Sequence, residues 1–316
     1  EIDLAGGADE LVLGAFANTV TVADAETITG VGGADVVIVT TQATGSTIDL
    51  GGAADRLTLA AYVNTVTLAG VETLTGGSTD DTVVFSAQAT GSTIDLADGN
   101  DTLTLGDFAN TITVSNVETI TGGSDDDLVT FAVEVENTVV DLGAGDDTLV
   151  IDVTGATVTV SNVETITGGG AADLVTLAVQ ATATTLDLGG GNDRLLLGAF
   201  VNTVTISNIE TVTGGASADT VTLAAQATAG RIDLAGGADE LVLGAFVNTI
   251  TVSNVETVTG GSTDDTVTLG AQATVGSIDL DAGDDTLVLG AFVNTVTASN
   301  VETITGGSTN DTVTLG

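Results

Sequence analysis

A nine-residue stretch, D-L-G-A-G-D-D-T-L at 141–149, returns in variant form along the whole chain of 316 residues. Its first aspartate recurs every 46 residues, at Asp3, Asp49, Asp95, Asp141, Asp187, Asp233 and Asp279. No linker, charge block or change of composition interrupts this period. The sequence therefore predicts one continuous repeat array over residues 1–316, in which each repeat packs against its neighbours.

The array has no visible cap. Residues 1–16 differ from residues 231–246 only at the first position, whereas solenoid ends normally carry a distinct capping repeat. The sequence also lacks an initiator methionine, a signal peptide and an apolar run of about 18 residues. We expect a piece of a longer chain or polymer, with no membrane span.

The charge balance narrows the possible partners. Three Arg and no Lys stand against 44 acidic residues, a formal net charge of −41. Such a surface repels nucleic acid and anionic membranes, so the expected partners are cations. The 43% apolar residues and mean hydropathy of +0.45 distinguish the chain from a disordered polyanion. The absence of Cys, Met, Trp and His suits a long-lived extracellular material.

Short runs with period two predict strands. Within one repeat these runs are 47–50 (T-I-D-L), 56–59 (R-L-T-L), 64–68 (N-T-V-T-L), 71–75 (V-E-T-L-T) and 82–85 (T-V-V-F). Gly, Asp and Asn separate them, and no window carries the three-and-four spacing of a helix. The chain is predicted to be all-β.

The repeat also divides in half. A glutamate stands midway between each repeat's aspartate and the next, at Glu26, Glu72, Glu118, Glu164, Glu210, Glu256 and Glu302. This favours a parallel β-solenoid of about 14 three-sided turns, each of about 23 residues, in seven repeats. The alternative is a seven-bladed β-propeller, whose blades have a similar length.

The solenoid prediction assigns side chains to the core. The inward residues of one repeat would be Ile48, Leu50, Leu57, Leu59, Val66, Leu68, Val71, Val83 and Phe85. A stacked aromatic ladder is also expected in the core, at Phe16, Tyr62, Phe108, Phe200, Phe246 and Phe292, with Thr154 in the gap.

An aspartate follows each glycine-rich turn in all fourteen half-repeats. These are Asp9, Asp35, Asp55, Asp81, Asp101, Asp127, Asp147, Asp173, Asp193, Asp219, Asp239, Asp265, Asp285 and Asp311. The turns 143–149 (G-A-G-D-D-T-L), 189–195 (G-G-G-N-D-R-L) and 76–83 (G-G-S-T-D-D-T-V), together with 260–267, resemble the nonapeptides of the repeats-in-toxin, or hemolysin-type calcium-binding, family. The resemblance extends to every half-repeat.

In that family the glycine-rich turns bind calcium between successive turns of a parallel β-roll. The resemblance implies that the fourteen aspartates supply carboxylates to Ca²⁺, and that carbonyl groups near Gly51, Gly76, Gly143, Gly189 and Gly260 complete the shell. It also implies a secreted protein of the bacterial surface. The turns depart from the motif at its first glycine, which is Leu50, Leu142 or Leu188 in three of them.

A metal-free reading is that Gly-x-Asp segments simply form turns at solenoid corners. Repulsion between the carboxylates favours turns with a bound cation over metal-free turns. Two carboxylates about 4.8 Å apart repel by about 0.9 kcal/mol even in water, so thirteen contacts reach about 12 kcal/mol, comparable with the stability of a domain.

A second acidic ladder, Asp49 and Glu72 with their equivalents, is expected to point outward into solvent, with a weaker cation site or a lateral contact as alternatives. Outward threonine pairs such as Thr65 and Thr67 resemble those of ice-binding solenoids, although Thr is also a favourable exposed strand residue.

An enzyme is not expected. There is no His, Lys or Cys to act as base or nucleophile, and every acidic residue has copies, whereas a catalytic pair is singular. We expect a calcium-stabilised structural solenoid of an extracellular filament, surface layer or adhesin stalk, able to associate end to end. A ligand- or ice-binding adhesin face and a carrier module of a secreted enzyme are the alternatives.

Overall fold

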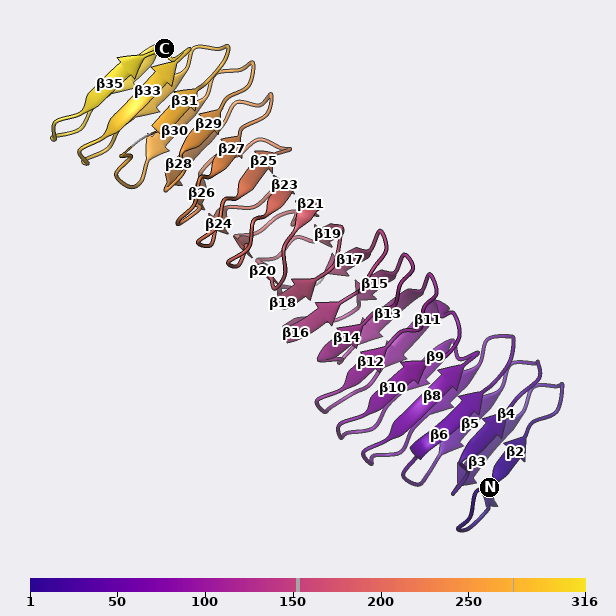
Figure 1. The fold of residues 1–316 in the computed structure, drawn as a ribbon. Helices are drawn as coiled ribbons and strands as arrows, with labels where there is room; N and C mark the ends of the chain where they lie inside the picture. Colours follow the sequence, from indigo (N-terminus) through magenta and orange to yellow (C-terminus); the bar gives the residue numbers. More distant parts are fainter. Residues whose placement is uncertain (152–153, 275) are drawn as a thin grey trace. The chain divides into compact units, whose positions relative to one another are not determined.

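The computed structural model describes residues 1–151, 154–274 and 276–316, and its regular secondary structure is entirely β-strand (Figure 1). The chain divides into two compact units. Unit 1 comprises Glu1–Val153 with Ser161–Val163, and unit 2 comprises Thr154–Val160 with Glu164–Gly316. No helix within the described ranges has the length and hydropathy needed to cross a membrane.

The strands of unit 1 are β1 (Ile2–Asp3), β2 (Glu10–Val12), β3 (Thr19–Ala23), β4 (Thr27–Thr29), β5 (Val36–Val39), β6 (Thr44–Asp49), β7 (Arg56–Thr58), β8 (Thr65–Ala69), β9 (Thr73–Thr75), β10 (Thr82–Phe85), β11 (Thr90–Asp95), β12 (Thr102–Thr104), β13 (Thr111–Ser115), β14 (Thr119–Thr121), β15 (Leu128–Phe131), β16 (Val135–Asp141) and β17 (Thr148–Ile151).

The strands of unit 2 are β18 (Ala156–Ser161), β19 (Thr165–Gly168), β20 (Leu174–Leu177), β21 (Thr182–Asp187), β22 (Arg194–Leu196), β23 (Thr203–Ser207), β24 (Thr211–Thr213), β25 (Thr220–Leu223), β26 (Gly230–Asp233), β27 (Glu240–Val242), β28 (Thr249–Ser253), β29 (Thr257–Thr259), β30 (Thr266–Leu269), β31 (Gly276–Asp279), β32 (Thr286–Val288), β33 (Thr295–Ser299), β34 (Thr303–Thr305) and β35 (Thr312–Leu315).

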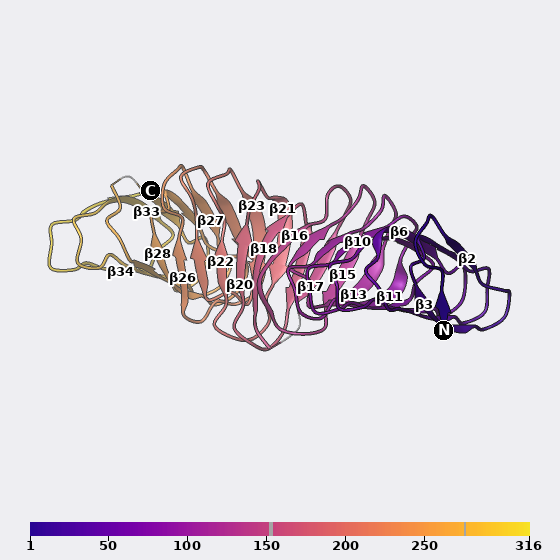
Figure 2. The ribbon, with the colours of Figure 1, turned by 90° about the horizontal axis from the view of Figure 1, so that it is seen from below.

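Each unit is a parallel β-solenoid with two sheets, as the stacked turns in Figure 2 show. Odd-numbered strands form one sheet and even-numbered strands the other, so a strand pairs with strands one turn before and after it. In unit 1, Leu57 of β7 pairs with Val37 of β5 and with Leu74 of β9. The prediction of a parallel solenoid is confirmed. The propeller alternative is wrong, because strands adjacent in sequence lie in different sheets instead of pairing within a blade.

The predicted turn of about 23 residues with three sides is wrong. Residues one turn apart are separated by 20 residues, as Asp35 and Asp55 are, or by 17 residues, as Asp55 and Glu72 are. A turn is short because it holds only two strands and two loops. Each 46-residue repeat supplies five strands, for example β6 to β10, and therefore makes two and a half turns. Consequently equivalent residues of successive repeats, such as Ile48 and Ile94, lie in opposite sheets.

The core lies between the two sheets and follows the alternation of the strands. All nine residues predicted to point inward in one repeat are buried. They stack on equivalents one turn away, as Leu57 does on Val37 and Leu74. Such columns of Val, Leu and Ile remove apolar surface from water at each turn.

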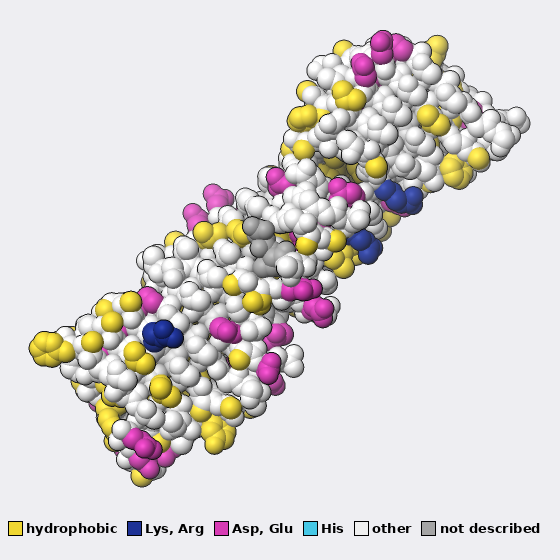
Figure 3. Space-filling view, turned by 180° about the vertical axis from the view of Figure 1, so that it is seen from behind, with side chains coloured by type: hydrophobic (Ala, Val, Ile, Leu, Met, Phe, Trp, Pro, Cys, Tyr) yellow, Lys and Arg dark blue, Asp and Glu magenta, His cyan; other side chains and the backbone are white. Residues whose placement is uncertain are grey.

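The prediction that the aromatic ladder is buried is wrong. Phe16, Tyr62, Phe108, Phe200 and Phe246 are exposed, and Phe292 is half-buried. Thr154 is exposed as well. The six aromatic residues lie in the loops that precede β3, β8, β13, β23, β28 and β33, outside the alternating strands. Figure 3 shows apolar side chains interspersed with acidic ones on one surface of the molecule.

Candidate functional site

The predicted aspartates occupy one structural position. Each of the fourteen immediately precedes a strand, at a corner where a loop enters a sheet. Twelve are buried, with 0–2% of their surface exposed: Asp35, Asp55, Asp81, Asp101, Asp127, Asp147, Asp173, Asp193, Asp219, Asp239, Asp265 and Asp285. Asp9 and Asp311 are half-buried. The turns thus bury carboxylates, which is unfavourable unless partners compensate them.

The corner aspartates are linked in pairs that lie one turn apart, in which the first residue donates its backbone N–H to a carboxylate oxygen of the second. In unit 1 the backbone N–H of Asp81 donates to Oδ1 of Asp101 at 2.6 Å. The same bond joins Asp35 to Asp55 at 2.6 Å and Asp127 to Asp147 at 2.7 Å. It recurs three times in unit 2, at 2.6–2.7 Å. These bonds link corners one turn apart and satisfy N–H groups that the sheets leave unpaired.

The ladder extends beyond the aspartates. Below Asp81, Asn64 donates both its backbone N–H and Nδ2 to Asp81 Oδ1, at 2.9 and 2.8 Å. Above Asp101, the N–H of Asp101 donates to Glu118 Oε2 at 2.7 Å. Asn64 Oδ1 itself accepts the N–H of Ala43 at 3.0 Å. This corner column therefore reads Ala, Asn, Asp, Asp, Glu over five turns, and its Asn member was not anticipated from the sequence. In the column of Asp173, Ala156 stands where this column has Asn, and its N–H donates to Asp173 Oδ1 at 2.8 Å.

Asp49 and Glu72, which represent the second acidic ladder, occupy different places in the fold. Glu72 is half-buried, and its Oε2 accepts the N–H of Asp55 at 2.8 Å, so the prediction that it points into solvent is wrong. Asp49 does lie exposed at the end of β6. Glu72 precedes a strand instead, because half a repeat does not correspond to a whole number of turns.

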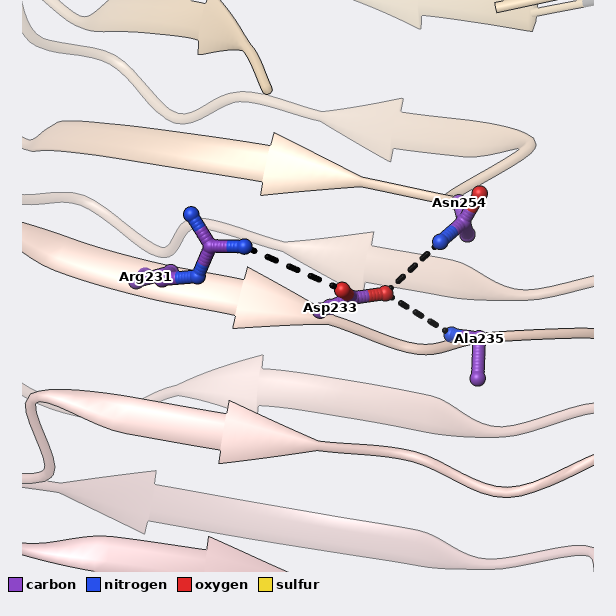
Figure 4. A network of polar contacts seen from close by, with 4 residues as sticks. All are labelled: Arg231, Asp233, Ala235 and Asn254. Carbon is purple, nitrogen blue, oxygen red and sulfur yellow. Dashed lines mark hydrogen bonds and ion pairs between the residues drawn. The ribbon is translucent and has the colours of Figure 1, made fainter. Parts of the chain in front are cut away.

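Asp49 and its equivalents form an exposed network of their own. Figure 4 shows it in unit 2, where Asp233 Oδ1 accepts Asn254 Nδ2 at 2.7 Å and the N–H of Ala235 at 3.2 Å. Arg231 lies 4.0 Å from Asp233 Oδ2. Asn254 has a φ of 52°, a conformation that Asn tolerates better than most residues. Its copies Asn116, Asn208 and Asn300 bond in the same way.

The second carboxylate oxygen distinguishes the aspartates. Oδ2 of Asp81, Asp127 and Asp219 faces the N–H of a glycine in its own turn, at 3.1, 3.3 and 3.4 Å. By contrast, a buried Oδ2 without a hydrogen-bond partner is found at Asp9, Asp35, Asp55, Asp101, Asp193, Asp239, Asp265 and Asp285. A buried oxygen without a donor is costly and calls for a proton or a cation.

Burial alters the acidity of these groups. It raises the pKa of Asp101, Asp193 and Asp239 to about 6, and the Asp and Glu residues of adjacent turns add to the rise. Burial also raises the pKa of Asp55 and Asp285. The hydrogen bond from the neighbouring aspartate N–H acts in the opposite direction in every case. The ladder is therefore an energetically costly set of anions.

The residues fit calcium in donor chemistry. Carboxylate and carbonyl oxygens are the ligands that Ca²⁺ prefers. Within the described ranges, no three acidic side chains come close enough to form a metal cluster. An ion would therefore combine an orphan Oδ2 with backbone carbonyls. Of the predicted carbonyl sites, the turn at Gly189 stacks directly on Gly169, whose carbonyl accepts the N–H of Gly190 at 2.7 Å.

No protein-family model matches this sequence, and no curated protein is significantly similar to it.

Proposed function

We propose that this chain is a structural β-solenoid of an extracellular bacterial surface assembly, such as a filament, surface layer or adhesin stalk, and that its aspartate turns bind calcium. The observation that carries the proposal is the recurrence of buried, unpartnered Asp Oδ2 atoms along a chain with a net charge of −41. Repetition of one site along a scaffold suits a material, since a catalytic site is singular.

Calcium would neutralise the buried charge. The residues that would hold it are the aspartates with an orphan Oδ2, such as Asp55, Asp101 and Asp239. Their Oδ1 atoms already fix each carboxylate through the N–H of the turn before, so the second oxygen is held in place for a ligand. The resemblance of the turns to the repeats-in-toxin nonapeptides supports the same cation and a secreted location.

Metal analysis and circular dichroism test the proposal together. Purified protein should retain calcium after gel filtration and lose it to excess chelator. Loss of the ion should lower the melting temperature, and millimolar calcium should restore it, while magnesium should restore less because it demands a small octahedral shell. An identical melting temperature with and without chelator would contradict calcium binding. End-to-end association into filaments stays a prediction, which electron microscopy of the purified chain can check.

A further inference from the structure

Arg194 and Arg231 of unit 2 are two of the three arginines in the chain, and both depart from the repeat. One repeat after Arg194 the same position carries Glu240, and one repeat before and after Arg231 it carries Thr185 and Ser277. The two arginines are 37 residues apart, which is not a multiple of the 46-residue period. The architecture that all repeats share therefore does not account for them.

The fold places these two arginines on one outward column. Arg194 of β22 pairs with Thr211 of β24, and Thr211 pairs in turn with Arg231 of β26. The next residue along each of these strands is buried, so all three side chains face outward. The arginines are thus two turns apart, with their Cα atoms separated by about 9.6 Å and Thr211 midway between them.

The charge of this sheet face differs from that of its opposite. The described even-numbered strands of unit 2 carry two arginines and one acid, Asp233, which gives a net charge of +1. The odd-numbered strands carry no arginine and three acids, a net charge of −3: Asp187, Glu240 and Asp279. In a chain with a net charge of −41, the even-numbered face of unit 2 is where an anion meets little repulsion.

Both guanidinium groups are accessible. Arg194 is exposed and forms no ion pair within the described part of the chain. The Arg231 side chain is 58% exposed, and its Nη2 lies 4.0 Å from Asp233 Oδ2 (Figure 4), which is longer than a hydrogen bond. Asp233 is also engaged elsewhere, because its Oδ1 accepts Asn254 Nδ2 at 2.7 Å. The donors of both arginines are therefore available to a ligand.

The acidic residues next to this column in sequence are held in the corner ladder. Asp193 is buried, and its Oδ1 accepts the N–H of Asp173 at 2.7 Å. Glu210 Oε2 accepts the N–H of Asp193 at 2.9 Å. Their carboxylates thus serve the backbone of the corner and form no ion pair with the arginines.

We infer that Arg194, Thr211 and Arg231 form a binding site for an oxyanion, a carboxylate or sulfate group seated over Thr211. The planar guanidinium group presents paired N–H donors that match such oxygens, and the hydroxyl of Thr211 adds a donor between them. Each arginine has to reach about one strand spacing, roughly 4.8 Å, to meet a group at the middle of the column. The half-buried Leu174, which pairs with Arg194, offers apolar surface to the remainder of an organic anion.

Nuclear magnetic resonance of the full chain tests this site directly. With three arginines and no lysine, nitrogen-15 labelling of arginine gives three Nε–H signals, which single Arg→Gln variants assign. Sodium sulfate is added at constant ionic strength against sodium chloride, and sodium acetate is the carboxylate probe. The signals of Arg194 and Arg231 should shift together with one dissociation constant. Arg56 is the internal control, since it pairs with Val36 and Thr73 and has no second arginine beside it.

Substitutions separate the site from general charge screening. Arg231→Gln should weaken the binding seen at Arg194 about tenfold, the loss of one charge-assisted hydrogen bond, whereas Arg56→Gln should leave it unchanged. Thr211→Val keeps the shape of the side chain and should weaken binding less. All three arginines are exposed, so circular dichroism should be the same for every variant.

The outcomes distinguish the sources of the oxyanion. Shifts of the Arg194 and Arg231 signals with added sulfate or acetate would establish a site for a free anion. The same two shifts on raising the protein concentration without added anion would identify the carboxylates of a second copy as the ligand. Equal shifts of all three signals, or no shift in excess of both probes and at high protein concentration, would overturn the inference. Every sample contains the same millimolar calcium, so the result does not depend on the chelation experiment.

Discussion

The backbone N–H of Asp81 points at Oδ1 of Asp101, 20 residues further along the chain, at 2.6 Å. The two oxygens of the Asp101 carboxylate therefore have separate roles. Oδ1 accepts a backbone N–H from the turn before, and Oδ2 is buried without a hydrogen-bond donor. Substitutions can separate the two roles.

Asp101→Asn should keep the hydrogen bond and remove the charge. An amide serves this position elsewhere, because Asn64 Oδ1 accepts the N–H of Ala43. Without calcium the Asn variant should be at least as stable as the wild type, and calcium should stabilise it less. Asp101→Ala leaves the buried N–H of Asp81 unpaired and should cost about 1–3 kcal/mol. Urea unfolding with and without calcium measures the stability of both variants. An equal loss of stability in the Asn and Ala variants would show that the position requires the carboxylate charge and not merely a hydrogen-bond acceptor.

Acidification should stabilise the calcium-free protein. The folded pKa of Asp101, Asp193 and Asp239 is about 6, above the ordinary 3.8, so the folded state binds protons more tightly than the unfolded chain. Their contribution is fully present below 3.8 and is lost as the pH rises through 6. Unfolding in chelator should therefore need more urea at about pH 5 than at about pH 7. Calcium bound as proposed would compete with these protons, so its own effect should be larger at the higher pH. Stability that falls on acidification across this window would contradict the buried-anion account.

Gly215→Ala should disrupt the stacking of turns in unit 2. An added Cβ would overlap the carbonyl oxygen of Gly198 and lie 2.7 Å from Ala199 Cα, both backbone groups that cannot turn aside. We expect a loss of about 1–3 kcal/mol, typical of overpacking. Gly236→Ala is the matched control, since nothing lies within 4 Å of its added Cβ. Thermal unfolding should show a lower melting temperature for the first variant alone.

Ala183→Gly should stabilise the protein. Ala183 has a φ of 68°, and Gly45 and Gly91 hold the equivalent position with φ of 67° and 68°. A left-handed alanine costs about 1 kcal/mol that glycine avoids. Ala144→Gly, in an exposed turn without positive φ, should instead destabilise slightly by making the unfolded chain more flexible. Opposite signs in chemical unfolding would confirm the assignment, and a loss at both positions would contradict it.

The alternation of the strands was enough to predict the parallel solenoid and its core. Residues such as Leu57 and Val83 lie inward because a strand alternates its faces whatever the length of the turn. The turn length could not be predicted in this way. The recurrence of an acidic residue every half-repeat, as at Asp49 and Glu72, looks like a turn, but one of the two ends a strand and the other precedes one. Only the pairing of the strands reveals that distinction.

The position of the corner aspartates was predicted from the sequence, but their burial and hydrogen-bond partners were not. The glycine-rich turns identify the corner aspartates, yet the burial of their carboxylates depends on loops stacked from other turns. Asn64 and Asn110 recur with the same 46-residue period, 17 residues before Asp81 and Asp127, so a signal for the whole ladder was present. The exposed aromatics were misassigned because recurrence shows that positions are equivalent without showing which way they face.

The half-integral number of turns per repeat constrains how such a gene can change length. Removing one 46-residue repeat inside a unit removes five strands. The remaining strands would still pair, because the next repeat has the same turns and strands. Each strand downstream of the deletion in that unit would, however, lie in the opposite sheet from before. A binding surface that had run along one sheet would then be interrupted at the deletion and continue on the opposite sheet. Removing or adding two repeats restores the original side, so recombination in pairs of repeats preserves any function that depends on one surface, whereas single-repeat events invert it.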